Sequence, residues 1–187
     1  NRAALYSGKA LDFDGVNDSV TATGSNTLSF SAITLSAYFK FDNLSSVQVI
    51  FHKRRDATGY QTAAFSMRAN GELWFATTTG TTEYKAVYSG FVTGKFYHAV
   101  GINDGSKNYL YINGQLVDTT ASGALDNTTT YDFVLGDYGT GNYFFNGQIA
   151  NAKVFNTALT AAQIADLYNF PEKIVPTGVD NTALKLW

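Results

Sequence analysis

Two segments of the sequence carry the side chains best suited to binding a ligand. Residues 137–143 and residues 52–60 both combine tyrosines with glycine and with charged or amide groups. The candidate ligand-binding side chains are Asp137, Tyr138, Asn142 and Tyr143 in the first segment, and Arg54, Arg55 and Tyr60 in the second. An exposed aromatic ring beside amide or carboxylate groups suits a sugar, and the arginines suit an anionic glycan. The alternative interpretation is a pair of solvated loops, because β proteins often carry tyrosine on strand faces.

A third segment is a candidate metal site. Asp14, Asn17 and Asp18 place three oxygen-bearing side chains within five residues. Calcium takes about six to eight oxygen ligands from carboxylates, amides and carbonyls, so one calcium ion is the metal that this segment would hold. The same residues also favour a turn without any ion, because Asp-Gly and Asn-Asp pairs are common turn formers.

The sequence argues against catalysis. Glycosidases use a pair of carboxyl groups, yet none of the three glutamates has an acidic residue two positions away. Asp12 and Asp14 are spaced to share one strand face, but the Phe-Asp-Gly that contains Asp14 favours a turn or an ion site. Of the two histidines, we interpret His98 as packed within a strand and His52 as solvent-facing at a strand end. With no Gly-x-Ser-x-Gly motif and no cysteine, we predict that the protein is not an enzyme.

Composition excludes two further classes of function. The formal net charge is −2 and the longest basic run is residues 53–55, whereas nucleic-acid binding needs a concentrated basic face. No apolar run approaches the roughly 20 residues of a membrane span. The 187 residues, 45% of them hydrophobic, are enough for one sizeable core. The chain has no signal peptide and no initial methionine, so we interpret it as a piece of a longer protein.

Alternation of apolar and polar residues predicts the elements that position these groups. In residues 33–41 every odd position is apolar, which predicts a half-buried antiparallel strand with its odd side chains in the core and its even ones in solvent. The predicted core side chains of this strand are Ile33, Leu35, Phe39 and Phe41. Similar short stretches recur between Asn-Gly and Asp-Gly turn signals. About twelve such strands predict an all-β protein made of two stacked antiparallel sheets.

One helix interrupts this pattern near residues 160–169. Thr160 and Gln163 form a capping-box signature, and Leu159 and Ile164 occupy the positions of a hydrophobic staple. Pro171 stops the helix soon afterwards. We expect the sandwich to span residues 1–173, and residues 174–187 to form a linker and a terminal strand or to begin a following domain.

Five segments in order resemble the laminin-G-like jelly-roll domain of the concanavalin A-like lectin/glucanase superfamily. Residues 10–20 read ALDFDGVNDSV and residues 110–114 read LYING. The other matching segments are residues 33–41, 95–100 and 144–160. The resemblance implies two curved sheets with ligand sites on rim loops or on a concave face. It also implies a calcium ion at the turn of Asp14, completed by two acids of a later strand that are Ala150 and Asn151 in this chain.

The resemblance and the residues together predict a non-catalytic recognition or adhesion module. We expect it to bind a glycan or a surface protein, outside the cell, on a cell surface or on a virus particle. Domains of this kind form arrays in bacterial surface proteins and in phage particles. The alternative is a structural capsid, tail or spike domain that contacts other virion subunits. A concave groove with convergent polar groups would favour the glycan, and a large exposed apolar patch would favour the subunit contact.

Overall fold

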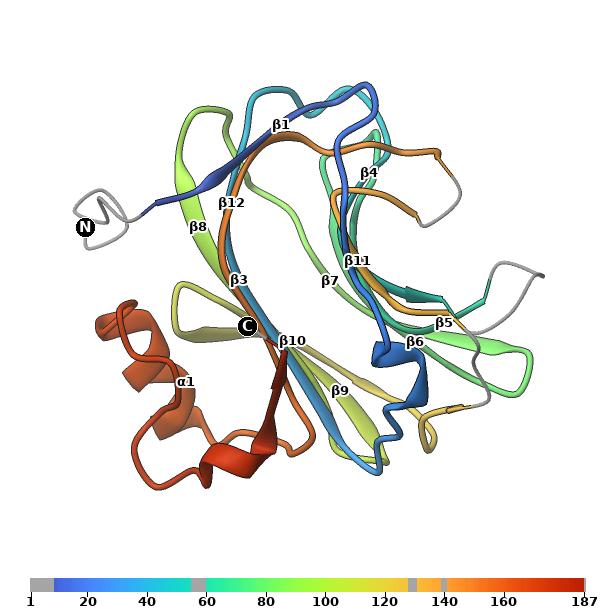
Figure 1. Cartoon of the computed structure of the whole chain (residues 1–187), viewed down its shortest axis with the longest axis vertical. Coiled ribbons are helices and arrows are strands. Elements are labelled where there is room, and N and C mark those ends of the chain that lie inside the picture. Colours follow the sequence, from blue (N-terminus) through green and yellow to red (C-terminus); the bar gives the residue numbers. More distant parts are fainter. Residues whose placement is uncertain (1–8, 55–59, 128–130, 139–140, 187) are drawn as a thin grey trace.

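The chain folds into two antiparallel sheets that stack face to face, with one short helix outside them (Figure 1). The computed structural model describes residues 9–54, 60–127, 131–138 and 141–186. Arg55 of the predicted ligand-binding set lies outside the described residues. The all-β two-sheet architecture expected from the alternation is confirmed.

The two sheets differ in size within the described part of the chain. The seven-stranded sheet has the order β1 (Leu11–Asp14), β12 (Asn146–Phe155), β3 (Ile33–Phe41), β8 (Phe96–Asn103), β9 (Lys107–Ile112) and β10 (Gln115–Ala121), and β13 (Leu184–Leu186) also pairs with β12. The six-stranded sheet has the order β2 (Val20–Ala22), β11 (Phe133–Leu135), β4 (Gln48–Arg54), β5 (Gln61–Met67), β6 (Leu73–Thr79) and β7 (Thr82–Tyr88). Neighbouring strands of each sheet are therefore often distant in sequence, such as β4 and β11.

The core lies between the facing sides of the two sheets. The four odd-numbered side chains predicted to point inward from β3 are fully buried there, which confirms the strand's register. Phe39 and Phe41 have ring centres 5.0 Å apart, and Phe41 lies 5.3 Å from Phe145. On β8, any side chain in place of Gly101 would collide with the ring of Phe75 from the opposite sheet. Close packing of the two sheets therefore requires glycine at this position.

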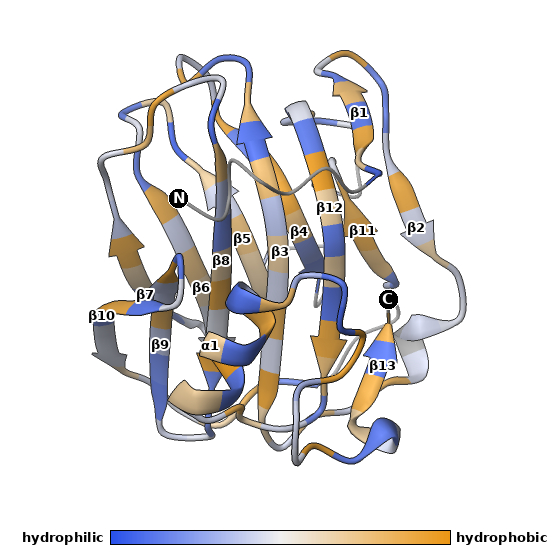
Figure 2. Cartoon of the chain, turned by 90° about the vertical axis from the view of Figure 1, so that its left-hand side faces the viewer, coloured by the Kyte–Doolittle hydropathy of each residue, from blue (hydrophilic) through white to orange (hydrophobic). Residues whose placement is uncertain are grey.

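The helix α1 (Ala161–Asn169) begins as its sequence predicts. The hydroxyl of Thr160 accepts a hydrogen bond from the Gln163 backbone N–H, and the Gln163 side-chain oxygen accepts one from the Thr160 backbone N–H. Ile164 and Leu167 are buried against the outer face of the seven-stranded sheet, over which α1 lies in Figure 2. No helix among the described residues is long and apolar enough to cross a membrane.

This helix corrects one expectation about β3. The even-numbered side chains were expected in solvent, but Thr34, Ser36 and Tyr38 are buried on the outer face of the sheet. The Tyr38 hydroxyl donates to the Tyr168 carbonyl at 2.9 Å. Alternation correctly predicts which side chains of β3 share a face. The face of the even-numbered side chains is covered by α1 and its flanking loops.

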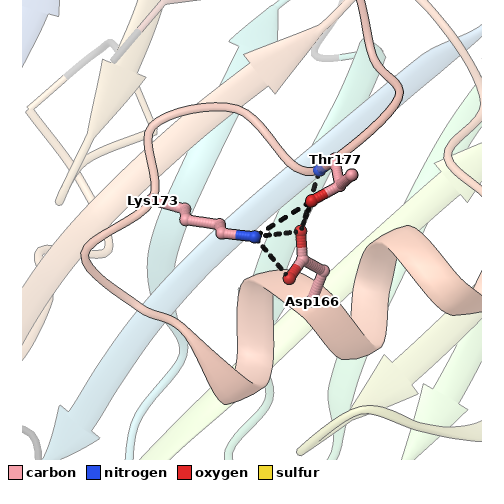
Figure 3. Close-up of polar contacts among 3 residues, drawn as sticks. All are labelled: Asp166, Lys173 and Thr177. Carbon is pink, nitrogen blue, oxygen red and sulfur yellow. Dashed lines mark hydrogen bonds and ion pairs between the residues drawn. The ribbon is translucent and has the colours of Figure 1, made fainter.

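Asp166 of α1 holds the segment that follows the helix through hydrogen bonds to Lys173 and Thr177 (Figure 3). Its carboxylate accepts hydrogen bonds from Lys173 Nζ at 2.8 and 2.9 Å, and from the backbone N–H of Thr177 at 2.8 Å. The chain then reaches β13, which pairs with β12 at Leu184 and Leu186. The terminal segment thus adds a strand to the seven-stranded sheet.

Candidate ligand-binding pocket

The two predicted ligand-binding segments meet at one pocket of about 440 Å³ on the six-stranded sheet. Tyr138 and Tyr143 come from the first segment, residues 137–143, and Tyr60 comes from the second, residues 52–60. The other lining residues are Val47, Val49, His52, Gln61, Ala64, Ser66, Arg68, Trp74 and Glu83. Because β11 pairs with β4, residues far apart in the sequence form a single site.

The pocket lies on the face of this sheet that points away from the core. Strand pairing places His52 beside Ala64, and Ser66 beside Trp74, in outward-facing rows. The intervening row, which includes Phe65, faces the core. Small side chains at positions 64 and 66 leave room above the strands. Figure 1 shows β4 to β7 curving so that this outer face is concave.

Tyrosines form one wall of the pocket. Tyr138 packs against the ring of His52 with centroids 4.3 Å apart, and it meets Tyr143 edge-to-face at 5.8 Å. Tyr143 is 52% exposed, so part of its surface is available to a ligand.

The remaining predicted residues of this loop hold it in shape. The buried Asp137 accepts hydrogen bonds from the backbone N–H groups of Gly141 and Asn142 at 3.2 and 3.1 Å. The Asn142 carbonyl in turn accepts the Tyr138 N–H. Asp137 and Asn142 are not among the residues that line the pocket. The structure therefore places them where they position the tyrosines.

Arg54 lies beside the tyrosine wall and is not a lining residue. Its guanidinium carbon lies 4.9 Å from the ring centre of Tyr131 and 6.0 Å from that of Tyr138. These cation–π contacts place a positive charge behind the wall.

The opposite wall is built around Trp74. The Arg68 guanidinium carbon lies 4.2 Å and Lys85 Nζ 3.9 Å from the centre of its ring. The indole N–H donates to Glu72 at 3.0 Å. Two cations and a carboxylate thus fix the orientation of the tryptophan, and Arg68 reaches the pocket beside it.

Glu83 supplies the carboxylate of the pocket lining within the described residues. One oxygen accepts a hydrogen bond from Gln61 Nε2 at 2.6 Å, and the other lies 3.2 Å from Lys85 Nζ. Both oxygens are therefore held by neighbouring side chains.

Sequence reasoning missed Arg68, Trp74 and Glu83 as members of the site. They belong to different strands or strand ends, and only the pairing of β5, β6 and β7 brings them together. The available signal was the alternation in β6, where Trp74 stands between the core residues Leu73 and Phe75. A tryptophan at an outward position indicates a surface aromatic.

The expectation that His52 faces solvent is wrong. The side chain is 1% exposed, because Tyr138 covers it. Burial, and secondly the positive charge of Arg54, lowers the pKa of His52 to about 3. Neither ring nitrogen has a hydrogen-bond partner among the described residues.

His98 is packed as the sequence predicts. It is buried under α1, bonds Ser36 at 2.9 Å and stacks on Tyr38 with ring centroids 4.4 Å apart. It therefore lies on the seven-stranded sheet, away from the pocket.

The predicted calcium segment forms a hydrogen-bonded turn. Asp14 Oδ1 accepts the backbone N–H of Val16 at 2.8 Å, and Asp18 Oδ2 accepts that of Asp14 at 2.9 Å. The other oxygen of each carboxylate has no donor among the described residues. Together with the Asn17 amide they supply three side-chain oxygens, and within the described residues no three acidic or histidine side chains gather. These donors fit only a site of low charge, completed by carbonyls and water.

The later strand does not complete this turn in the way that the resemblance implies. The residue opposite Asp14 on β12 is Asn146, and Ala150 lies four positions farther along. Asn151 donates its side-chain N–H to the Pro171 carbonyl at 2.6 Å. Positions 150 and 151 therefore lie away from the turn.

Comparison with known proteins identifies the same architecture. A laminin G family model, described as the concanavalin A-like lectin/glucanases superfamily, matches residues 14–165. No curated protein sequence matches this chain.

Solved structures with the same fold come from several organisms. Domain 4 of an extracellular arabinanase from Geobacillus stearothermophilus, in complex with arabinotriose, has a TM-score of 0.69 at 20% identity, over 87% of this chain and 78% of that one. A Bacteroides ovatus protein predicted to bind carbohydrate has a TM-score of 0.65 at 19% identity, over 83% and 45%. Mouse laminin α1 domains LG4–5 have a TM-score of 0.64 at 12% identity, over 82% and 44%. This chain spans less than half the length of the last two. At these identities the likeness is one of fold.

Proposed function

We propose that this chain, which belongs to the concanavalin A-like lectin/glucanases superfamily, binds a carbohydrate in the pocket on the concave face of its six-stranded sheet. The observation that carries the proposal is the convergence of three tyrosines with Arg68 and Glu83 around about 440 Å³. Aromatic rings can contact the C–H faces of a sugar while charged groups bind its hydroxyls. The arabinanase domain that was solved with arabinotriose has the same fold.

We propose recognition without catalysis. Glycoside hydrolysis generally uses two carboxyl groups that flank the scissile bond. The described lining of the pocket contains the carboxylate of Glu83, and both of its oxygens are engaged by Gln61 and Lys85. A glycan that binds here would therefore leave unchanged.

The test is a glycan array followed by calorimetric titration. The soluble panel contains arabinotriose, as a neutral trisaccharide, and trigalacturonate, as an acidic one. Removing aromatic contacts worth about 0.5–1.5 kcal/mol each should weaken binding roughly tenfold or more in the double variant Tyr60→Ala/Tyr143→Ala. After a long incubation with the protein, the oligosaccharide should be recovered unaltered.

The matched control is Phe170→Ala. Phe170 is 43% exposed and follows α1 on the other side of the molecule, so this variant removes a comparable ring outside the pocket. Equal affinity for the unaltered chain and the double variant would overturn the proposed site. Hydrolysis of a panel member would overturn the non-catalytic role.

The proposed setting is extracellular, on a cell or a virus particle, where the partner is a glycan or a glycan-bearing surface protein. The net charge of −2 and the absence of cysteine from the sequence are compatible with either surface.

A second candidate function, a structural contact with other subunits of a particle, is favoured by one observation. Two adjoining cavities of about 360 and 120 Å³ share Val20, Leu135 and Ala152 at the open edge between the sheets. Leu11 and Val20 beside them are 51% and 43% exposed. A contact made through this apolar edge would be disrupted by Val20→Lys, and sedimentation of the assembled particle would report the loss.

A further inference from the structure

His52 is a buried polar side chain at the pocket whose two ring nitrogens have no partner among the described residues. Leaving a buried polar group unpaired destabilises the folded state. Its strand neighbours are Val134 on β11 and Ala64 on β5, and the ring of Tyr138 packs on it. An apolar residue would suit these neighbours better, so the folded chain alone does not account for the histidine.

The second buried histidine shows what a structural role looks like in this protein. His98 is as buried as His52, and its Nδ1 also lacks a partner among the described residues, but its Nε2 bonds Ser36 Oγ at 2.9 Å. His98 is not among the pocket-lining residues, whereas His52 is. His52 therefore differs from His98 in two ways: neither of its nitrogens is paired among the described residues, and it lines the pocket.

We propose that His52 is a specificity-determining residue of the pocket, whose ring nitrogens hydrogen-bond hydroxyl groups of the bound saccharide when the covering ring of Tyr138 turns aside. This inference rests on the proposed carbohydrate function and deepens it. A neutral imidazole offers one N–H donor and one acceptor nitrogen. A sugar hydroxyl can both donate and accept, so adjacent hydroxyls can satisfy both nitrogens. A carboxylate can only accept, and it would leave the acceptor nitrogen unpaired.

The ring stays neutral over the range in which most proteins work. Burial, followed by the charge of Arg54, lowers the pKa of His52 to about 3. Among the described residues, the other charged groups around the pocket include Arg68, Glu72, Glu83 and Lys85. Binding that depends on a neutral His52 should not change as the pH crosses the ordinary histidine range near 6.5.

The central experiment replaces the polar ring with an apolar one of similar size. His52→Phe removes two unpaired buried polar atoms, so we expect an equal or higher midpoint of thermal unfolding. We also expect at least tenfold weaker binding of the array-selected oligosaccharide, measured by calorimetry. If His52 had only a structural role, its substitution would not raise the unfolding midpoint while weakening saccharide binding. His52→Gln keeps a donor and an acceptor and should retain part of the affinity.

The matched control is His98→Phe. Ser36 loses its partner in this variant, so the unfolding midpoint should fall while the affinity stays unchanged. Equal affinity of His52→Phe and the unaltered chain would overturn the inference. If His52→Phe does not fold, monodeoxy analogues of the same oligosaccharide and the ¹⁵N shifts of the His52 ring provide the test in the unaltered chain. The inference would also be overturned if every monodeoxy analogue bound with unchanged affinity and binding did not move these ¹⁵N shifts.

Failure of the inference differs from failure of the proposed function. Binding that survives His52→Phe but is lost in Tyr60→Ala/Tyr143→Ala overturns only the role of His52. If no oligosaccharide on the array binds, both proposals are overturned.

Discussion

His52 and His98 are both held uncharged in the folded chain, each with a pKa lowered to about 3 mainly by burial. In the unfolded chain a histidine takes up its proton near pH 6.5. Below that pH the unfolded state therefore binds protons that the folded state does not, until the pH approaches 3. The free energy of unfolding should thus fall with acid by roughly 1.4 kcal/mol per pH unit for each histidine.

This acid sensitivity can be measured by urea unfolding between pH 7 and pH 5. We expect His52→Phe and His98→Phe each to remove about half of the slope, since each retains the other buried histidine. A slope unchanged in both variants would show that other groups cause the loss.

At the same scale, the turn of Asp14 and Asp18 remains a proposed calcium site. Calcium that binds only the folded state stabilises it by about 2.7 kcal/mol at a hundredfold excess over its Kd. With two carboxylates, the affinity should lie in the range of about 10⁻⁴–10⁻³ M. Millimolar calcium should therefore raise the unfolding midpoint, and chelator or Asp18→Ala should remove the rise. Equal midpoints with chelator, calcium and magnesium would mean that the residues only shape the turn.

At the scale of the element, β3 is the central strand on which both layers pack. Its odd side chains form the core with the six-stranded sheet, and its even side chains support α1. Phe39 is fully buried against Phe41, Phe91 and Tyr97. Phe39→Ala should lower the free energy of unfolding by roughly 3–5 kcal/mol, because the cavity cannot collapse between two sheets. Chemical denaturation measures the loss, and a change below about 1 kcal/mol would contradict this packing.

At the scale of the whole molecule, the two sheets have different outer faces. The seven-stranded sheet buries the part of its outer face around β3 and β8 under α1 and the segment held by Asp166. The six-stranded sheet keeps a concave outer face, where the pocket lies. Core packing and ligand binding are therefore separated on opposite sides of β4, β5 and β6. Side chains of the pocket can change without altering the core, and for this reason the pocket variants proposed above should fold.

Local and periodic features of this protein are determined by its sequence. Alternation identifies the core side of β3, and the box of Thr160 and Gln163 starts α1, because both depend on residues close together in the chain. The tyrosine-bearing segments are likewise visible as candidates.

Only the tertiary structure decides which outward residues meet. Alternation shows that the side chains of His52 and Trp74 point away from the core, but it does not show which residues pack against them. Pairing of β4 with β11 brings Tyr138 over His52, and pairing of β5 with β6 brings Trp74 beside Ser66. The same limit hid the burial of Tyr38 beneath α1. The alternation of apolar and polar residues shows that the two faces of a strand differ. It does not show which residues pack on each face, because these come from distant parts of the chain.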